Sequence, residues 1–333
     1  MHVLVTGCDS GFGWALVHKL LAQKVSVIAC YHSVKSRDAM HVSDLLTKLV
    51  IDVTDDASIA KMSREVTSLL QSVSGKLEAV VHNAGGLLVA GPAEWSPIDQ
   101  DKAQMDLNFF GAVRVVNALL PHIRHSQGRI ILVSSVLGRV ASPLGAMYSA
   151  SKFALEGWAD ALRREMLAFG VTVHLIEPGM FVSTRFYQNY GKQVATNWHS
   201  VSEQVRTDYG SAYKEYCVKR LIRLKEFFGA SNIDPVIDCM VHAIQSSWPR
   251  HRYPVGIDST VFARIIAWLP YSAGDLAMTL ADALVMRDRG MIPVAPAMSK
   301  HSLIIAHTAL FRYNQSWLLV VSVIVFLAVC IST

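Results

Sequence analysis

Short apolar runs alternate with longer amphipathic segments over the first 180 residues of the chain. Six runs are rich in β-branched residues and almost continuously apolar, and they lie at 2–6, 25–30, 48–52, 78–82, 129–133 and 171–176. Such runs are typical of parallel strands that are covered on both faces. Helical segments separate them, at 11–23, 56–71, 99–125 and 147–169, and would form right-handed crossovers. The pattern predicts an α/β fold with a single doubly wound parallel sheet and helices on both faces.

The pattern changes after residue 180. Residues 182–230 are polar, rich in aromatic residues and weakly helical, whereas 233–247 have the spacing of an amphipathic helix. A seventh strand is expected at 252–256. An apolar helix at 261–269 would either touch the surface of a bilayer or pack in the core or a dimer interface. The expected organisation is a domain over 1–285 with a helical substrate-side extension at about 182–285, a linker at 286–315 and a separate segment at 316–333.

The segment at 316–333 carries no charged residue. Its length is at the short end of the roughly 17–25 residues that span a bilayer as a helix. Trp317 and Tyr313 lie at its start, and Arg312 and Lys300 precede it, as in the aromatic belt and basic flank of a membrane helix. We therefore expect a C-terminal transmembrane helix, with the catalytic domain in the cytosol and the endoplasmic reticulum as the membrane. The alternative is a buried C-terminal helix.

Composition and charge exclude several classes of protein. Of the 333 residues, 52% are apolar, which rules out a disordered chain. The net charge is +5, and no run of Lys or Arg predicts a nucleic-acid surface. The five cysteines include no Cys-x-x-Cys pair, so neither a disulfide framework nor a metal site is predicted.

A glycine-rich turn follows the first predicted strand, in the sequence TGCDSGFG at 6–13. Gly7 would allow a tight exit from the strand, Gly11 a close approach to a pyrophosphate, and Gly13 close packing of helix on strand. The N-terminus of the next helix would then present N–H groups to phosphates. The spacing differs from the usual G-x-G-x-x-G, and taken alone the motif could be only a turn.

Tyr148 and Lys152 are four residues apart, so they share one face of the helix predicted at 147–169. An ammonium group close to a phenol lowers the tyrosine pKa from about 10. Such a tyrosine can accept a proton from an alcohol or give one to a ketone. The same spacing at Tyr31 and Lys35 follows the second strand, where it is taken as a coincidence in a loop.

Other polar groups and glycines follow the remaining strands. Ser135 ends the fifth strand, thirteen residues before Tyr148, and Asn108 lies in the helical segment before that strand. Three more groups lie at strand ends: Asp52-Val53, Asn83-Ala84-Gly85 and Pro178-Gly179. A doubly wound sheet binds ligands at the carboxyl ends of its strands, so all these residues are expected to surround one site.

These motifs together resemble the short-chain dehydrogenase/reductase family, which has a Rossmann fold. The resemblance covers about 1–285 and is carried by TGCDSGFG, NAG, VSSVLGRV, YSASK and LRREMLAFGVTVHLIEPG. It is closest to the branch of retinol dehydrogenases, hydroxysteroid dehydrogenases and D-3-hydroxybutyrate dehydrogenase.

The resemblance implies a catalytic tetrad of Asn108, Ser135, Tyr148 and Lys152. Ser135 would hold the substrate oxygen, and Tyr148 would transfer the proton. Lys152 would bind the nicotinamide ribose and tune Tyr148, while Asn108 would order a water for proton relay. The implied cofactor-binding residues are Thr6, Gly7, Asp9, Ser10, Gly11, Phe12, Gly13, Asp52, Val53, Asn83, Ala84, Gly85, Tyr148, Lys152, Pro178, Gly179, Ser183 and Thr184.

The sequence departs from the family pattern at three places. His82 stands where a first Asn is usual, and Thr184 comes one residue late, so that Ser183 could take its role. The second strand ends without the acid that binds an adenosine ribose. Because no arginine replaces that acid, NAD is the expected cofactor, although Arg37 nearby keeps NADP open.

The expected function is hydride transfer between NAD and a lipophilic alcohol such as a retinol or a hydroxysteroid. Leu137, Met147, Met180 and Phe181 would contribute an apolar substrate pocket. A D-3-hydroxybutyrate dehydrogenase is the alternative enzyme, and a membrane-anchored binding protein without catalysis is the alternative from another class. The expected partners are the lipophilic substrate and a membrane, with self-association into a homo-oligomer left open.

Overall fold

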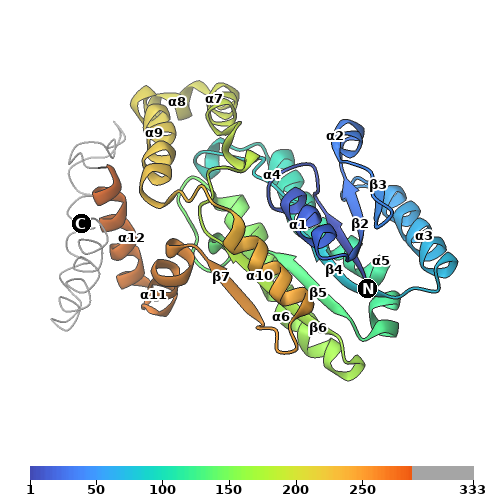
Figure 1. Cartoon of the computed structure of the whole chain (residues 1–333). Coiled ribbons are helices and arrows are strands. Elements are labelled where there is room, and N and C mark those ends of the chain that lie inside the picture. Colours follow the sequence, from blue (N-terminus) through green and yellow to red (C-terminus); the bar gives the residue numbers. More distant parts are fainter. Residues whose placement is uncertain (287–333) are drawn as a thin grey trace.

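A computed structural model describes residues 1–286, so the membrane anchor expected at 316–333 and residues 287–315 of the linker lie outside the described part. One parallel sheet of seven strands runs through the centre, in the order β3-β2-β1-β4-β5-β6-β7 (Figure 1). The strands are β1 (His2–Thr6), β2 (Ser26–Tyr31), β3 (Leu46–Val50), β4 (Leu77–His82), β5 (Arg129–Val133), β6 (Thr172–Pro178) and β7 (Arg252–Val255). The order reverses between β1 and β4, which is where a doubly wound sheet binds its ligand. All seven strands lie within two residues of their expected positions, and the predicted fold class is confirmed.

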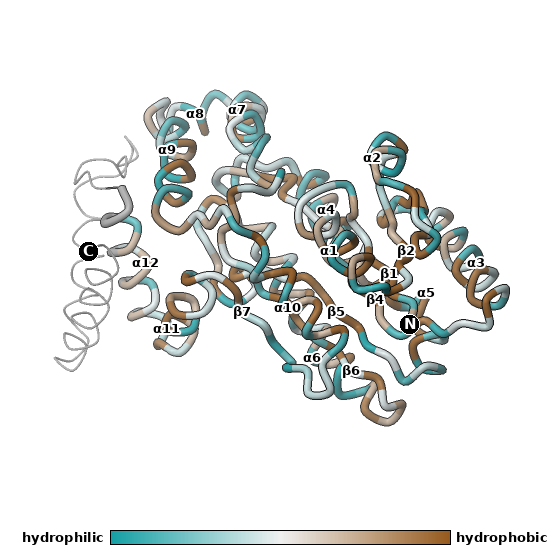
Figure 2. The backbone as a smooth tube through the Cα atoms, in the orientation of Figure 1, coloured by the Kyte–Doolittle hydropathy of each residue, from teal (hydrophilic) through white to brown (hydrophobic). Residues whose placement is uncertain are grey.

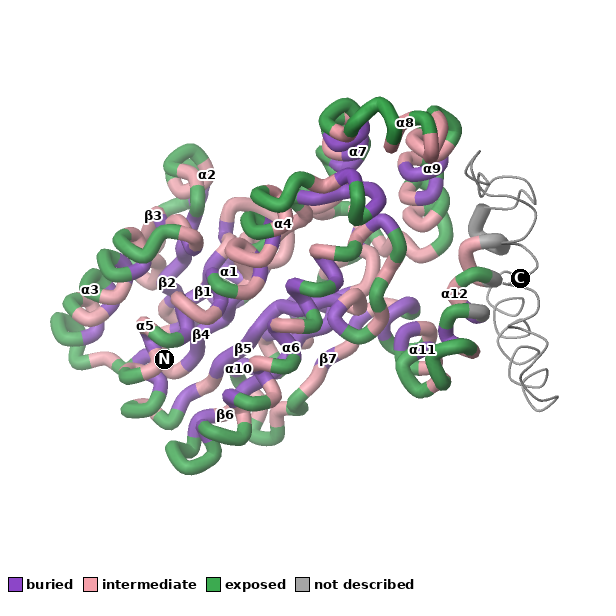
Figure 3. The backbone as a smooth tube through the Cα atoms, turned by 180° about the vertical axis from the view of Figure 1, so that it is seen from behind, coloured by how far each residue is buried: buried purple, intermediate pink, exposed green. Residues whose placement is uncertain are grey.

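Helices cover both faces of this sheet. Those flanking it are α1 (Gly11–Ala22), α2 (Val34–Ala39), α3 (Asp56–Ser72), α4 (Ile98–Met105), α5 (Gly111–Ser126), α6 (Ala146–Met166) and α10 (Asp234–Gln245). Helices α1 and α10 pack against each other on one face, whereas α3, α5 and α6 contribute to the core on the other. The edge strand β3 is only half-buried, whereas β1, β2, β4, β5 and β6 are hydrophobic and buried over most of their length (Figures 2 and 3). Their nearly continuous apolar sequence is explained by burial on both faces.

The helix expected at 99–125 is interrupted. Residues Asp106–Phe110 form a π-helical turn between α4 and α5. The turn contains Asn108, which is fully buried. Turns of this kind are rare and are frequent at functional sites.

The part after β6 is more helical than its sequence suggested. It contains α7 (Tyr190–Ser200), α8 (Glu203–Tyr209), α9 (Ser211–Phe228), α11 (Ala263–Trp268) and α12 (Tyr271–Met286). The residues expected to be weakly helical form α7–α9 because Trp95, Trp198 and Tyr216 join a separate aromatic cluster there. Helices α9 and α12 pack together beside the carboxyl ends of the strands (Figure 1). Within residues 1–286, no helix combines the length and hydrophobicity needed to cross a bilayer.

Candidate active site

A cavity of about 840 Å³ lies at the carboxyl ends of the strands. One side is formed by the glycine-rich turn after β1 and by the ends of β2, β3 and β4, and the other side by β5, α6, α9 and α12. The cavity therefore extends from the switch point of the sheet into the helical extension. It brings most of the residues expected at strand ends to one place.

The glycine-rich turn has the conformation expected of a phosphate-binding loop. Gly7 and Gly11 have φ angles of +69° and +60°, which favour glycine. A side chain on Gly13 would collide with the carbonyl oxygen of Gly7. No side chain caps the start of α1, where Ser10 is the N-cap, so its first backbone N–H groups remain available to an anion.

Three side chains connect this turn to its neighbours. The Thr6 hydroxyl oxygen accepts hydrogen bonds from the backbone N–H groups of Asn83 and Ala84, both at 3.1 Å. The amide of Asn83 donates back to the carbonyl oxygen of Gly7 at 3.0 Å. The Asp9 carboxylate accepts hydrogen bonds from His32 N (2.8 Å) and Ser33 N (3.0 Å). Asp9 thus lies at the end of β2, on the side of the cavity where the usual acid is missing.

Asn108 is held between the β4 end and α6. Its side-chain oxygen accepts from Gly86 N at 2.9 Å, and its amide donates to the Ser151 hydroxyl at 3.0 Å. A side chain on Gly85 would approach Asn108 Oδ1 to 3.0 Å and Lys152 Nζ to 3.6 Å. The asparagine therefore fixes the backbone after β4 and the helix that carries Tyr148.

Tyr148 and Ser135 are both buried, and both line the cavity. Burial raises the pKa of Tyr148 to about 12, while the nearby Ser135 hydroxyl acts in the opposite direction. The expectation that Lys152 lowers this pKa is not met in the structure. The reason is geometric: Lys152 Nζ donates to the carbonyl oxygen of Val133 at 3.0 Å and lies 5.8 Å from the centre of the phenol ring.

The Lys152 ammonium is itself perturbed. Burial lowers its pKa to about 8, and the negative charge of Glu156 partly offsets this. An ammonium has three donors, and among residues 1–286 only the Val133 carbonyl accepts from it. The remaining donor capacity lies at the wall of the cavity, where it suits the hydroxyl groups of a ribose.

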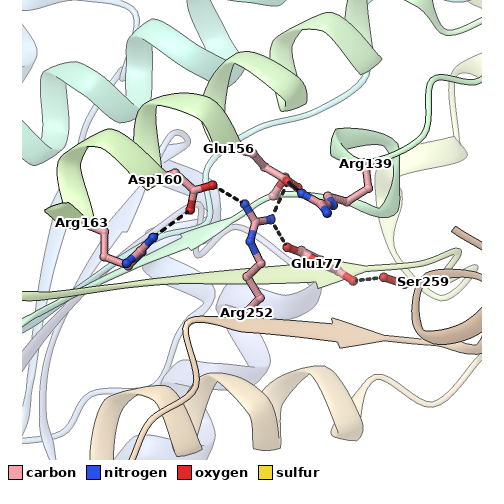
Figure 4. A network of polar contacts seen from close by, with 8 residues as sticks. Arg139, Glu156, Asp160, Arg163, Glu177, Arg252 and Ser259 are labelled. Atoms are coloured by element: carbon pink, nitrogen blue, oxygen red, sulfur yellow. Dashed lines mark hydrogen bonds and ion pairs between the residues drawn. The ribbon is translucent and has the colours of Figure 1, made fainter. Parts of the chain in front are cut away.

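A network of charged residues lies behind Ser135, as shown in Figure 4. Arg252 of β7 bonds Glu156 (2.7 Å), Glu177 (2.5 Å) and Asp160 (2.8 Å). Glu156 also accepts from the Ser134 hydroxyl at 2.8 Å. Since Ser134 directly precedes Ser135, the network connects the end of β5 to α6, β6 and β7.

A second buried carboxylate supports the loop after β6. Asp258 accepts hydrogen bonds from Met180 N at 2.7 Å and from Ser259 N at 3.0 Å. Burial raises its pKa, and these backbone donors act against that shift. Asp258 thereby fixes the backbone of Pro178–Met180 at the edge of the cavity.

The structure brings most of the expected residues to the cavity wall. The following line it: Gly7, Asp9, Ser10, Gly11, Phe12, Asp52, Val53, Asn83, Ala84, Gly85, Ser135, Leu137, Tyr148, Lys152, Pro178, Gly179, Met180, Phe181 and Thr184. Five others do not: Thr6, Gly13, Asn108, Met147 and Ser183. The first three support lining residues from behind. Met147 precedes Tyr148 on α6, and successive helical residues point about 100° apart. Thr184, rather than Ser183, reaches the cavity.

Several lining residues were missed by the sequence analysis. Four of them are Arg220, Asp258, Asp282 and Phe186, whose ring packs edge-on against that of Tyr148 with 5.1 Å between the ring centres. Each comes from the segment after β6, where the family motifs quoted above end. No local spacing in the sequence points to them, because they meet the site only through tertiary packing.

Comparison with known proteins agrees with this geometry. The sequence profile of the short chain dehydrogenase family matches residues 1–195. The chain belongs to that family. It is 34% identical over 284 residues to 17-beta-hydroxysteroid dehydrogenase type 6 of Bos taurus, and the aligned region covers 83% of this chain and 87% of the relative. It is 35% identical over 276 residues to retinol dehydrogenase 16 of Mus musculus, covering 81% and 84% respectively.

A solved structure of a short-chain dehydrogenase from Streptomyces avermitilis is also similar. Its TM-score is 0.64 at 25% identity, over 85% of this chain and 96% of that one. As a member of this short-chain dehydrogenase family, the protein is an NAD(P)-dependent oxidoreductase of the alcohol dehydrogenase type. The residues present fit the cofactor, because the uncapped helix start suits a pyrophosphate and the partly unpaired Lys152 ammonium suits a ribose.

Proposed function

We propose that this short-chain dehydrogenase oxidises a lipophilic alcohol such as a retinol or a hydroxysteroid. The observation that carries the proposal is the cavity beside Ser135 and Tyr148. Its substrate side is lined mainly by apolar side chains: Leu137, Val140, Leu144, Met180, Phe181, Phe186, Leu221, Leu224, Phe228, Phe262 and Met278. Pockets of this size and character bind largely apolar ligands and use a few polar groups for orientation.

In this proposal each tetrad residue has one task. Bound NAD(P) supplies the hydride acceptor. Ser135 holds the substrate oxygen, and Tyr148 accepts its proton during oxidation or returns it during reduction. Lys152 holds the ribose and contributes positive charge, while Asn108 orders a water that exchanges protons with solvent.

We propose NAD as the preferred cofactor. The Asp9 carboxylate lies at the end of β2 and lines the cavity, where it would repel a 2′-phosphate. Arg37 is paired with Asp38 at 2.8 Å and is not among the cavity residues. A higher kcat/KM with NAD than with NADP is expected, and a clear advantage for NADP would overturn this choice.

A D-3-hydroxybutyrate dehydrogenase is the second candidate. A small hydroxy acid calls for an unpaired cation to bind its carboxylate. Two arginines line the cavity among residues 1–286. Arg220 is buried and neutralised by Asp282, whereas Arg185 is exposed, so that water and salt weaken its attraction for a carboxylate. This pairing favours the lipophilic substrate. The test is an assay of the purified enzyme with both cofactors against retinol, hydroxysteroids and 3-hydroxybutyrate; turnover of the hydroxy acid alone would reverse the order.

We further propose that the domain at 1–285 is held at the endoplasmic reticulum membrane, in the cytosol, by the segment at 316–333. The support is the uncharged sequence of that segment and its basic, aromatic flank. Such an attachment would keep the active site close to a lipophilic substrate that is dissolved in the bilayer.

A further inference from the structure

An ion pair stands in the apolar part of the cavity wall. Arg220 is on α9 and Asp282 on α12, and both line the same cavity as Tyr148. Arg220 is 4% exposed. The tetrad is carried by the turn after β5, the π-helical turn and α6. This pair belongs instead to the helical extension, which Figure 1 shows at the end of the molecule away from α3.

The Nε and Nη2 atoms of the guanidinium group bind Asp282 closely, whereas Nη1 has no close hydrogen-bond acceptor. Toward Asp282, Nη2 donates to Oδ1 at 2.7 Å, and Nε lies 3.1 Å and 3.2 Å from the two carboxylate oxygens. Nη1 has only long contacts, at 3.4 Å to Pro143 O and 3.5 Å to Ser142 Oγ. Nη1 therefore has donor capacity left for a better acceptor.

A buried ion pair is an expensive way to join two helices. Removing both charges from water costs free energy that their attraction returns only in part, and well-packed apolar residues often replace such pairs without loss of stability. In a binding cavity, by contrast, a few polar groups among apolar ones fix the orientation of the ligand. Because the pair is neutral as a whole, it suits an uncharged oxygen rather than a carboxylate.

We propose that Arg220, held by Asp282, binds a second oxygen of the substrate, remote from the alcohol that reacts at Tyr148. The substrate class is then a bifunctional lipophilic alcohol, such as a steroid with oxygen at both ends, rather than an alcohol with a single oxygen such as retinol. This inference rests on the proposed function and narrows it.

The test compares substrates that differ only in the remote oxygen. Androstane-3,17-diol is assayed beside androstan-3-ol and androstan-17-ol, with retinol as a fourth substrate. The wild type is expected to favour the diol over the mono-ol with the same reacting hydroxyl by roughly tenfold or more in kcat/KM, which a hydrogen bond to a charged group supplies. In Arg220→Met this ratio should fall to about one.

Two further variants keep the result interpretable. Arg220→Met combined with Asp282→Leu replaces the pair by apolar residues, and it should fold and still lose the preference. Arg223→Met, an exposed arginine on the same helix, should keep the wild-type ratio. The inference would be overturned by an equal loss of activity on diol and mono-ol in the Arg220 variants, or by a wild type without preference for the diol. Either result would leave the proposed function standing. A wild-type enzyme that oxidises neither the steroids nor retinol would overturn the proposed function itself.

Discussion

The carboxylate of Asp258 occupies the space that a side chain at Gly179 would need. A Cβ atom built on Gly179 collides with all three atoms of that carboxyl group. The carboxylate is fixed there because it accepts hydrogen bonds from Met180 N and Ser259 N. Gly179 and Asp258 lie almost 80 positions apart in the chain, and they are in direct contact at the edge of the cavity.

Gly179→Ala is expected to destabilise the fold by about 1–3 kcal/mol, as overpacking does in a filled interior, and to impair turnover by displacing the loop. The double variant with Asp258→Ala should lose less than the sum of the two single changes, because the collision is relieved. Thermal unfolding and kcat/KM are the measurements. Gly157→Ala on α6 is the matched control and should be neutral or slightly stabilising, because the added carbon meets no atom within 4 Å beyond the neighbouring residues and backbone of its own helix. Strict additivity of the two changes would contradict this relationship.

Tyr148→Phe removes the hydroxyl that we propose transfers the proton, and it keeps the ring that packs against Phe186. We expect kcat to fall at least about 10²-fold, with little change in cofactor affinity or thermal stability. Steady-state kinetics, cofactor titration and thermal unfolding measure these three quantities. Tyr271→Phe, at a position 94% exposed, should behave like the wild type. Wild-type turnover in the Tyr148 variant would remove this residue from the mechanism.

The rate of alcohol oxidation should rise with pH between 6 and 8. In the proposed mechanism oxidation needs Tyr148 as a base. Burial raises its pKa to about 12, so each step up in pH increases the deprotonated fraction. Above pH 8 the rise should flatten, because the pKa of Lys152 is about 8 and its positive charge is lost there. Ketone reduction needs the protonated phenol, which predominates below pH 12, so that direction should show no matching rise. Profiles of kcat/KM in both directions decide the matter; oxidation that slows from pH 6 to 8 would refute the assignment.

Arg252→Met should destabilise the protein by about 3 kcal/mol. The change leaves Glu156 and Glu177, which are almost fully buried, without their shared cation. Chemical denaturation measures the effect. The exposed pair of Arg223 and Glu226 gives the comparison, since Arg223→Met should cost no more than about 0.5 kcal/mol. Equal effects at the two sites would mean that the network in Figure 4 contributes no more than a surface pair.

Truncation after Arg312 tests the proposed anchor. The full chain should stay with membranes in high salt and in alkaline buffer, and the truncated chain should be released, because the uncharged segment is gone. Fractionation followed by immunoblotting is sufficient. Release of the full chain by alkali would show that the segment does not span. Retention of the truncated chain until detergent is added would point instead to the α11–α12 turn, where Trp268 is 87% and Tyr271 94% exposed.

The resemblance to the family implied the tetrad of Asn108, Ser135, Tyr148 and Lys152. The sequence by itself determined the sheet, the glycine-rich turn and the helix face that Tyr148 and Lys152 share. These features depend on local periodicity, on glycine at tight turns and on the four-residue spacing along one helix, all of which can be recognised without tertiary contacts. The parallel sheet then brings the ends of its strands to one edge. That geometric consequence is why residues from five strands could be expected at one site.

Only the tertiary structure decided which acid meets Gly179, which carboxylates share Arg252, and that Arg220 and Asp282 meet in the cavity. These partners are between 62 and 96 positions apart in the chain. The packing of α9 on α12 joins Arg220 to Asp282, whereas the pairing of β6 with β7 beside α6 brings the carboxylates to Arg252. The same is true of the pKa of Tyr148. The four-residue spacing predicted a lowered value, but burial is a property of the whole fold, and in the protein it outweighs the influence of a lysine that is bonded to Val133.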